Sequence, residues 1–164
     1  MNESSDKMNS LHMDKAITSE IGEIIDCLND CALKDAYFSD DALTRAFIAR
    51  AVANEELYVC KDASGTVTGF MIIDYAGMFS AFPYLKVIAV KPEVRRHGIG
   101  GMMLEYFEET GFARNTKVFL CAGDFNHDAI RLYEENGYVK TGLIPSLYRE
   151  GFDEHLMMKA GPEV

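Results

Sequence analysis

The sequence predicts one mixed α/β domain, in which a central mixed sheet is flanked by helices. Three observations support this prediction. The chain has 164 residues, enough for one domain with a proper core. Its composition, 48% apolar and 26% charged, is that of a globular protein. Stretches with strand and helix periodicity alternate in the second half, with no internal repeat and no Pro- or Ser-rich linker. We therefore expect a flexible tail over residues 1–10 and a single domain over residues 11–164.

The first half predicts strands and helices in the order βααβββ. Residues 11–17 read as a strand, and Ser19 is a candidate N-cap for a helix whose apolar residues continue to Cys31. A second helix begins at residues 39–41, where Ser and Asp side chains can cap it. The remaining elements are a hairpin of two strands and one further strand, over residues 57–60, 67–75 and 84–90.

The second half predicts the order αβαββ. A helix covers residues 98–111, and the apolar run 117–122 is typical of a strand that is buried on both faces. A short helix over 128–136 ends at an Asn-Gly pair, which is a good helix stop. The last two strands lie on either side of a loop over residues 144–153, at residues 138–143 and 155–159.

Charge and cysteine usage exclude several classes of protein. Lys and Arg number 16 and Asp and Glu 26, so the formal net charge is −10, which repels nucleic acid and attracts cationic small molecules or basic peptides. No apolar run reaches the roughly 20 residues that span a bilayer, and the N-terminus lacks a secretion signal. The four cysteines form no CxxC pair. We expect a cytoplasmic protein without a membrane segment, a bound metal or a nucleic-acid partner.

Residues 87–101 contain the strongest functional signal. An apolar strand leads into a basic, glycine-rich turn and then into an amphipathic helix. Amides at a helix start are unpaired and carry partial positive charge, and glycines let the backbone approach a ligand closely. The pattern predicts a site for an anion such as a phosphate. It contains neither the GxxxxGK[ST] motif of P-loop proteins nor the GxGxxG motif of dinucleotide-binding proteins. Four of the 16 basic residues lie at this segment: Lys86, Lys91, Arg95 and Arg96.

The segment Arg95-Arg96-His97-Gly98-Ile99-Gly100 resembles the acetyl-CoA-binding signature Gln/Arg-x-x-Gly-x-Gly/Ala of the GNAT acyltransferase superfamily. The resemblance implies the GNAT fold, with a strand that separates from its neighbour at a bulge. It also implies acetyl-CoA as the co-substrate. The backbone that would bind the pantetheine arm is that of Ile88, Ala89 and Val90. The residues that would bind the pyrophosphate are Arg95, Arg96, His97, Gly98, Ile99, Gly100 and Gly101.

A second segment, residues 124–138, matches the later motif of the same superfamily, Asn-x-x-Ala-x-x-Leu-Tyr-x-x-x-Gly-Phe/Tyr. The resemblance implies that Asn126 contacts the pantetheine arm, that Ala129 leaves room for it, and that Tyr133 lies close to the cofactor sulfur. Tyr133 alternatively packs only against its apolar neighbours, and Asn126 also reads as a helix cap. A calcium loop is a poor match, because Ala129 stands where such a loop needs glycine and a strand precedes the segment.

The resemblance implies an N-acetyltransferase that acts on a primary amine of a small molecule or peptide. The amine would attack directly in a ternary complex, so that no enzyme nucleophile is needed and Cys121 need not be one. Tyr133 would protonate the departing thiolate, and a backbone amide near Val90 would stabilise the oxyanion. The general base is not evident. The candidates are Asp74, Glu150 and His155, or a water chain that leaves no trace in the sequence.

In this superfamily the acceptor is selected by the first two helices and the loop between the last two strands. Aromatic rings beside carboxylates in these regions suit a cationic amine. The residues are Tyr37, Phe38, Asp40, Asp41, Tyr148, Arg149 and Glu150. Homodimers are frequent in the superfamily, although nothing in the sequence indicates one. The missing base leaves an alternative open, namely a non-catalytic acyl-CoA-binding module or sensor.

Overall fold

The computed structural model describes residues 10–163, so the tail predicted over residues 1–10 lies outside it except for Ser10. One seven-stranded sheet has the strand order β1-β2-β3-β4-β5-β7-β6. The β4–β5 pair is parallel and all other neighbours are antiparallel, which confirms the predicted mixed sheet. The strands are β1 (His12–Lys15), β2 (Leu57–Lys61), β3 (Val67–Met78), β4 (Phe82–Val90), β5 (Lys117–Gly123), β6 (Val139–Arg149) and β7 (Phe152–Ala160). The helices are η1 (Thr18–Glu20), α2 (Ile21–Asp26), α3 (Ala32–Tyr37), α4 (Asp41–Ala53), η2 (Pro92–Val94), α5 (Ile99–Phe112) and α6 (His127–Glu135).

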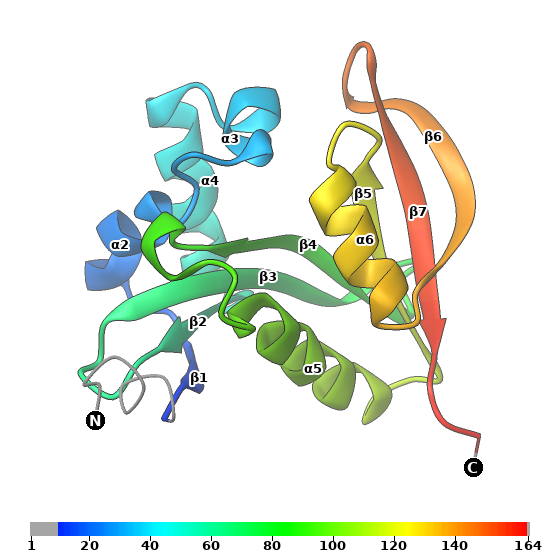
Figure 1. Ribbon diagram of the computed structural model, residues 1–164, viewed down its shortest axis with the longest axis horizontal. Helices are drawn as coiled ribbons and strands as arrows, with labels where there is room; N and C mark the ends of the chain where they lie inside the picture. Colours follow the sequence, from blue (N-terminus) through cyan, green and yellow to red (C-terminus); the bar gives the residue numbers. More distant parts are fainter. Residues whose placement is uncertain (1–9, 164) are drawn as a thin grey trace.

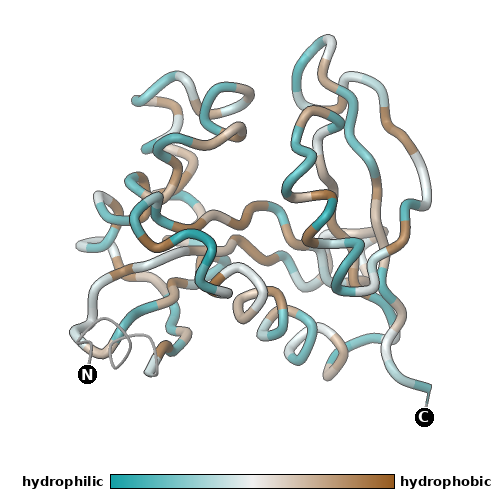
Figure 2. The backbone as a smooth tube through the Cα atoms, in the orientation of Figure 1, coloured by the Kyte–Doolittle hydropathy of each residue, from teal (hydrophilic) through white to brown (hydrophobic). Residues whose placement is uncertain are grey.

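Helices cover both faces of the sheet, with α5 and α6 on one face and α2 and α4 on the other (Figure 1). Alternate residues of the central strands therefore belong to two separate cores. Met71 packs in the core that includes α5, whereas the next residue, Ile72, packs with α2 and α4. The hydropathy colouring of Figure 2 accordingly shows hydrophobic stretches along the central strands, with hydrophilic turns on the helices. Strand periodicity of two residues thus positions both helical layers.

A β-bulge at Lys86 reverses which side chains of β4 point to each face of the sheet. Ile72 pairs with Val87, but the next residue of β3, Ile73, pairs with Leu85, so that Lys86 is the extra residue. Leu85 lies in the core with α5, whereas Val87, two positions later, lies in the core with α2 and α4. Without the bulge these two side chains would share a face.

The same point marks the separation of β4 from β5. Their parallel pairing consists of Tyr84 with Phe119 and Leu85 with Leu120, and no further pair follows. Beyond it β4 continues toward α2 and α4, while β5 runs with β7 and β6 in a separate wing that carries α6 (Figure 1). The backbone edge of β4 from Lys86 to Val90 therefore has no strand partner on the β5 side.

The first predicted helix is wrong in its extent. Sequence periodicity indicated one helix from Ser19 to Cys31, but η1 and α2 end at Asp26 and a separate helix, α3, begins at Ala32. The intervening turn contains Asp30 with a φ of 50°, a left-handed conformation that no α-helix contains. Ser19 is not the cap either, because the N-cap position of α2 is Glu20, whose carboxylate accepts from the amide of Ile17.

The loop predicted over residues 144–153 is also wrong. β6 runs on to Arg149, and only Glu150 and Gly151 separate it from β7. β6 contains Pro145, but it is the last strand of the sheet, where a proline is tolerated because its outward-facing side has no partner strand. The pairing is irregular between Ile144 and Arg149, and Ser146 has a φ of 50°, so the strand bends there without ending.

No helix among residues 10–163 is long and apolar enough to cross a membrane.

Candidate active site

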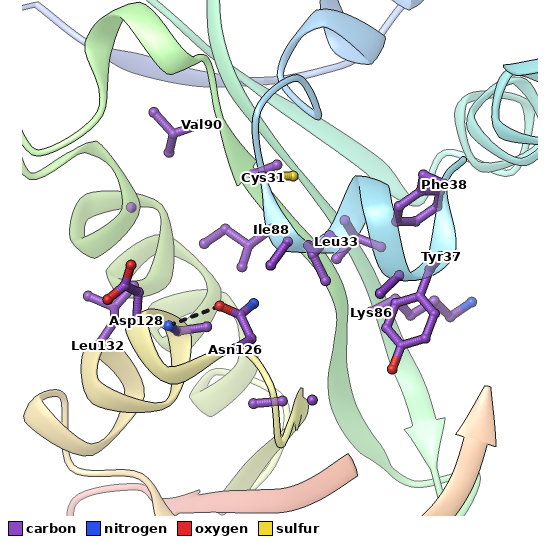
Figure 3. A pocket seen from close by; sticks show the side chains of 18 of the residues that line it. Cys31, Leu33, Tyr37, Phe38, Lys86, Ile88, Val90, Asn126, Asp128 and Leu132 are labelled. Atoms are coloured by element: carbon purple, nitrogen blue, oxygen red, sulfur yellow. Dashed lines mark hydrogen bonds between the residues drawn. The ribbon is translucent and has the colours of Figure 1, made fainter. Parts of the chain in front are cut away.

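A cavity of about 1470 Å³ opens where β4 and β5 separate. Its walls are β4, the turn before α5, the start of α6, the α3–α4 segment and the β6–β7 hairpin, and Figure 3 shows residues of several of these walls facing one another. Of the predicted cofactor residues, only His97 does not line the cavity; its ring Nδ1 instead lies 3.2 Å from the carbonyl oxygen of Val94. The residues that line it are Ile88, Ala89, Val90, Arg95, Arg96, Gly98, Ile99, Gly100, Gly101, Asn126, Ala129 and Tyr133.

The turn before α5 presents a row of free backbone amides. Within residues 10–163, the amides of residues 96–101 donate to no acceptor, and the first helical bond is made by Met102 to the carbonyl of Gly98. Arg96 and Gly98 have left-handed φ values of 64° and 82°, which curl the backbone around these amides. A Cβ atom added at Gly98 or Gly101 would meet no atom within 4 Å. The result is an open cradle at a helix N-terminus, suited to an anion.

The side chains of the basic cluster are mostly engaged elsewhere. The Arg95 guanidinium donates to the carbonyls of Val90 (2.8 Å), Asn29 (2.6 Å), Asp30 (2.6 Å) and Cys27 (3.4 Å). It therefore connects the α2–α3 turn to the end of β4, and what it offers the cavity is chiefly its backbone.

Of the other three basic residues, the two lysines form ion pairs, whereas Arg96 forms none in the part of the chain that the structure describes. Lys91 lies 3.2 Å from the Glu23 carboxylate, and Lys86 pairs with Glu56 and Asp74. Arg96 has no partner among the described residues, so it is the basic side chain of this cluster that remains available to a bound anion.

Asn126 caps α6 and faces the cavity at the same time. Its Oδ1 accepts from the amide of Ala129 at 3.4 Å, as the cap interpretation predicted. The nitrogen of its side-chain amide points away from the helix (Figure 3) and has no acceptor in the described chain. One side of the amide group is thus held by the helix, and the other is free to donate to a ligand.

Tyr133 is buried but reaches the cavity. The residue is 5% exposed, its ring lies 5.9 Å from that of Tyr138, and its hydroxyl makes no hydrogen bond within the described residues. The hydroxyl oxygen is nevertheless not fully enclosed. Its accessible part therefore faces the cavity that Tyr133 lines. Burial, together with the nearby Glu154 carboxylate, raises the pKa of Tyr133, which keeps the phenol protonated.

The far end of the cavity, opposite the cradle, is aromatic. The rings of Tyr148, Phe125 and Phe152 surround that of Tyr37 at centroid distances of 5.8, 5.8 and 6.1 Å. The hydroxyl of Tyr148 lies 2.6 Å from that of Tyr84 on β4. This end therefore combines α3, β4 and the β6–β7 hairpin, which lie far apart in the sequence.

Arg149 joins the hairpin to α3. Its guanidinium donates to the carbonyl of Ala36 at 2.9 Å and stacks 4.6 Å from the centroid of Phe152. Of the acceptor residues that the sequence predicted, Asp41 and Glu150 do not line the cavity. Those that do are Tyr37, Phe38, Asp40, Tyr148 and Arg149.

None of the three candidate bases lines the cavity. Asp74 pairs with Lys86, Glu150 lies in the exposed β6–β7 turn, and His155 Nε2 lies 2.6 Å from the Asp124 carboxylate. Among the described residues, the buried carboxylate that lines it is that of Glu154, which is 2% exposed and accepts a hydrogen bond from Tyr37; Asp30, Asp40 and Asp128 also line it but are exposed.

The sequence does not identify Glu154, because it predicts a loop over residues 144–153, and the face on which a residue directly after a loop lies cannot be predicted. The one sequence feature that could have indicated Glu154 is its position just before the apolar residues of the last strand.

Among the described residues, no three His, Cys, Asp or Glu side chains form a group that could hold a metal ion.

Comparisons with known proteins agree with this geometry. The model of the acetyltransferase (GNAT) family matches residues 22–138. The N-alpha-acetyltransferase RimI of Mycobacterium tuberculosis is 31% identical over 134 residues, which are 79% of this chain and 84% of that protein. An uncharacterized protein of Mycobacterium leprae is also 31% identical over 134 residues, but the chain spans only 37% of its length.

Solved structures share the fold. A GNAT-family acetyltransferase of Bacillus cereus has a TM-score of 0.74 at 20% identity, over 94% of this chain and 99% of that one. Ard1 of Thermoplasma volcanium has a TM-score of 0.73 at 22% identity, over 93% and 99%. Naa20 of Chaetomium thermophilum, solved with a bisubstrate analogue, has a TM-score of 0.69 at 20% identity, over 91% and 86%. At these identities the likeness concerns the fold alone.

Proposed function

The chain belongs to the acetyltransferase (GNAT) family, and we propose that it is an N-acetyltransferase that transfers the acetyl group of acetyl-CoA to a primary amine. The observation that carries the proposal is the continuity of one cavity. The residues with free amides at 96 and 98–101, the unpaired edge of β4, and Tyr133 all line it.

The residues of the cradle fit the cofactor. A diphosphate needs several donors that converge on it, and residues 96–101 offer successive free amides at a helix N-terminus, with Arg96 beside them. The pantetheine arm contains amide groups, and the backbone of β4 from Lys86 to Ala89 has no strand partner on the β5 side, so it can pair with them as a further strand would. The Asn126 side chain adds a donor from the opposite wall. Bound acetyl-CoA would supply an acetyl group activated as a thioester.

Tyr133 is the proposed proton donor to the departing sulfur. A buried phenol with a raised pKa remains protonated at neutral pH and can give its proton as the thiolate leaves. Cys121 also lines the cavity, but burial raises the pKa of its thiol and disfavours the reactive thiolate. Direct attack by the amine therefore fits this site better than an acyl-cysteine.

The acceptor would enter at the aromatic end. We propose an amine of a peptide or small molecule, because tyrosine rings and the Glu154 carboxylate favour a cation there. A peptide amino terminus is supported by the relative named as an N-alpha-acetyltransferase, RimI. The net charge of −10 attracts such cationic acceptors.

Release of free thiol tests the proposal. The chain is incubated with acetyl-CoA and, separately, with spermidine, lysine and a tetrapeptide that begins with a free alanine. Thiol release that depends on one of these amines, with the matching acetylated product in the mass spectrum, is the expected result. Tight CoA binding without release from any of them would instead favour the non-catalytic binding module. A melting temperature that CoA does not change would contradict both functions.

A further inference from the structure

We propose that Glu154 is the general base of the transfer, with Tyr37 as the residue that positions its carboxylate. This inference rests on the proposed acetyltransferase function and assigns the proton acceptor that the function still lacks. The starting observation is geometric: Glu154 lies on β7, in the cavity wall, at the aromatic end where an amine would enter.

The two carboxylate oxygens of Glu154 have different surroundings. Oε1 accepts the hydroxyl proton of Tyr37, a residue 117 positions away on α3. Oε2 has no hydrogen bond within residues 10–163, and it is not fully enclosed by other atoms. Since the residue as a whole is 2% exposed and lines the cavity, the small accessible part of Oε2 opens into that cavity. One oxygen is thus held in place and the other is free to accept a proton.

Glu154 also lacks a neutralising cation. The other buried glutamate of the described chain, Glu20, pairs with Lys61, as buried carboxylates normally do. No Lys or Arg side chain of the described residues lies within ion-pair distance of Glu154. The Arg149 guanidinium, on the same hairpin, donates to the carbonyls of Asp35 and Ala36 instead. A buried carboxylate without a cation is costly, and an arriving ammonium group would remove that cost.

The titratable groups around Glu154 leave its carboxylate basic. Those that act on it or respond to it are Tyr37 on α3, Cys121 on β5, Tyr133 on α6, Tyr148 on β6 and the adjacent His155. Burial raises the pKa of Glu154, while the Tyr37 hydrogen bond and His155 act in the opposite direction. The net effect is a raised pKa, which makes the Glu154 carboxylate a stronger base than an exposed one.

Glu154 and Tyr133 together account for every proton that the reaction moves. Oε2 of Glu154 takes one proton from the acceptor ammonium, which becomes a neutral amine. The nitrogen lone pair then forms the C–N bond as the C–S bond breaks, and Tyr133 gives its proton to the sulfur. The amide nitrogen releases its second proton, which returns to the Tyr133 oxygen through solvent. Glu154 releases its proton to water, so both side chains end as they began.

Glu154→Gln tests the assignment, because the amide keeps the size of the side chain and an oxygen for Tyr37 but cannot take the proton. With the amine that the wild-type protein acetylates among spermidine, lysine and the alanine tetrapeptide, we expect kcat/KM at pH 7 to fall by about 100-fold or more. The deficit should shrink as the pH rises toward the pKa of the amine, since solution then supplies the neutral form. The CoA dissociation constant should stay within about twofold of wild type. Glu150→Gln, the same change in the exposed turn of this hairpin, is the matched control and should behave as wild type.

The outcomes separate the two proposals. A Glu154→Gln variant whose kcat/KM stays within about threefold of wild type at pH 7 overturns the base assignment and leaves the acetyltransferase function intact. A deficit that is equal at every pH, or that comes with weakened CoA binding, shows a structural role and also overturns it. A wild-type protein that acetylates none of the three amines overturns the proposed function and this inference together.

Discussion

Tyr133 and Glu154 are buried polar side chains on two different elements, and each has a polar atom that only the cavity can satisfy. Tyr138 shows by contrast what a merely structural hydroxyl looks like in this protein. It is buried beside Tyr133, its hydroxyl is fully enclosed near the Glu108 carboxylate, and it does not line the cavity. Access to the cavity, and not burial alone, therefore distinguishes the two proposed catalytic side chains from a structural one.

Tyr133→Phe should lower kcat by about 100-fold, because the leaving sulfur loses its proton donor. The CoA dissociation constant should change by less than about twofold, since the ring that shapes the cavity wall is kept. Steady-state kinetics and calorimetric titration with CoA measure the two effects. Tyr138→Phe removes the neighbouring hydroxyl as a matched control and should leave kcat at the wild-type value. Equal kcat values for Tyr133→Phe and wild type would show that the phenol gives no proton.

Glu154→Gln should also raise the melting temperature at pH 7.5, by a few degrees. The pKa of Glu154 is higher in the folded protein than in an unfolded chain, so the folded state loses stability as the pH rises through that pKa. The amide has no charge to desolvate, and its advantage should vanish near pH 3, where the carboxyl group is protonated in both states. Thermal unfolding of the two proteins across this pH range measures the difference. A lower melting temperature for the variant at pH 7.5 would mean that the Tyr37 hydrogen bond outweighs the burial of the charge.

At the scale of elements, the N-terminus of α5 and the bulge in β4 do most to shape the site. The turn before α5 frees the amides of residues 96–101 by taking left-handed φ values at Arg96 and Gly98. The bulge at Lys86 lies at the end of the β4–β5 pairing, from which the unpaired edge begins. The resemblance to GNAT proteins implied a bulge but not its position. The unpaired edge begins four residues before Val90, the residue near which an oxyanion donor was expected.

Gly98→Ala should cost about 1 kcal/mol of stability, because its φ of 82° is strained for any residue with a Cβ atom. It should also weaken CoA binding by at least about tenfold, because the new methyl group points into the open cradle. Chemical denaturation and CoA titration measure the two effects. Gly65→Ala is the matched control, since Gly65 has the same φ of 82° in the β2–β3 turn and does not line the cavity. The two variants should lose similar stability, and equal CoA affinities would contradict a role for the cradle.

At the scale of the whole molecule, the site depends on contacts between segments that are distant in sequence. Arg95 holds the α2–α3 turn against the end of β4, and Arg149 holds the β6–β7 hairpin against α3. Between them these two side chains connect the end of β4, the α2–α3 turn, α3 and the last hairpin. The cavity keeps its shape because both guanidinium groups bind main-chain carbonyls.

Arg95→Lys should destabilise the protein by about 1–3 kcal/mol, because a lysine cannot reach the several carbonyls that the guanidinium joins. We expect the CoA dissociation constant and the KM of the amine to rise together, since the turn that leads into α3 loses its attachment. Denaturant unfolding and steady-state kinetics measure these changes. Arg45→Lys, on the exposed face of α4 and without a partner among the described residues, should change none of them. A CoA dissociation constant that rises while the KM of the amine stays unchanged would show that Arg95 does not connect the two ends of the cavity.

Sequence reasoning recovered most of the elements, and all the proposed cofactor residues except His97 line one cavity, but it failed at defined places. The central strands β2, β4 and β5 and helix α5 were located closely, because apolar periodicity there coincides with burial on the two faces of the sheet. The break between α2 and α3 was missed, since the apolar spacing continues across it to Cys31. The full length of β6 was missed, and only the place of this strand at the sheet edge makes Pro145 compatible with it.

The sequence by itself determined the cradle, because glycines and a helix start act through the local backbone, within a few residues of one another. Only the tertiary structure decided the aromatic end of the cavity, where we propose that the acceptor enters. Tyr37 and Glu154 meet across 117 positions, and they do so because β5 leaves β4 at Leu85 and the hairpin packs back against α3. Contacts of that separation depend on where the strands part and which face each residue takes. A single bulge, such as the one at Lys86, is enough to reverse that facing.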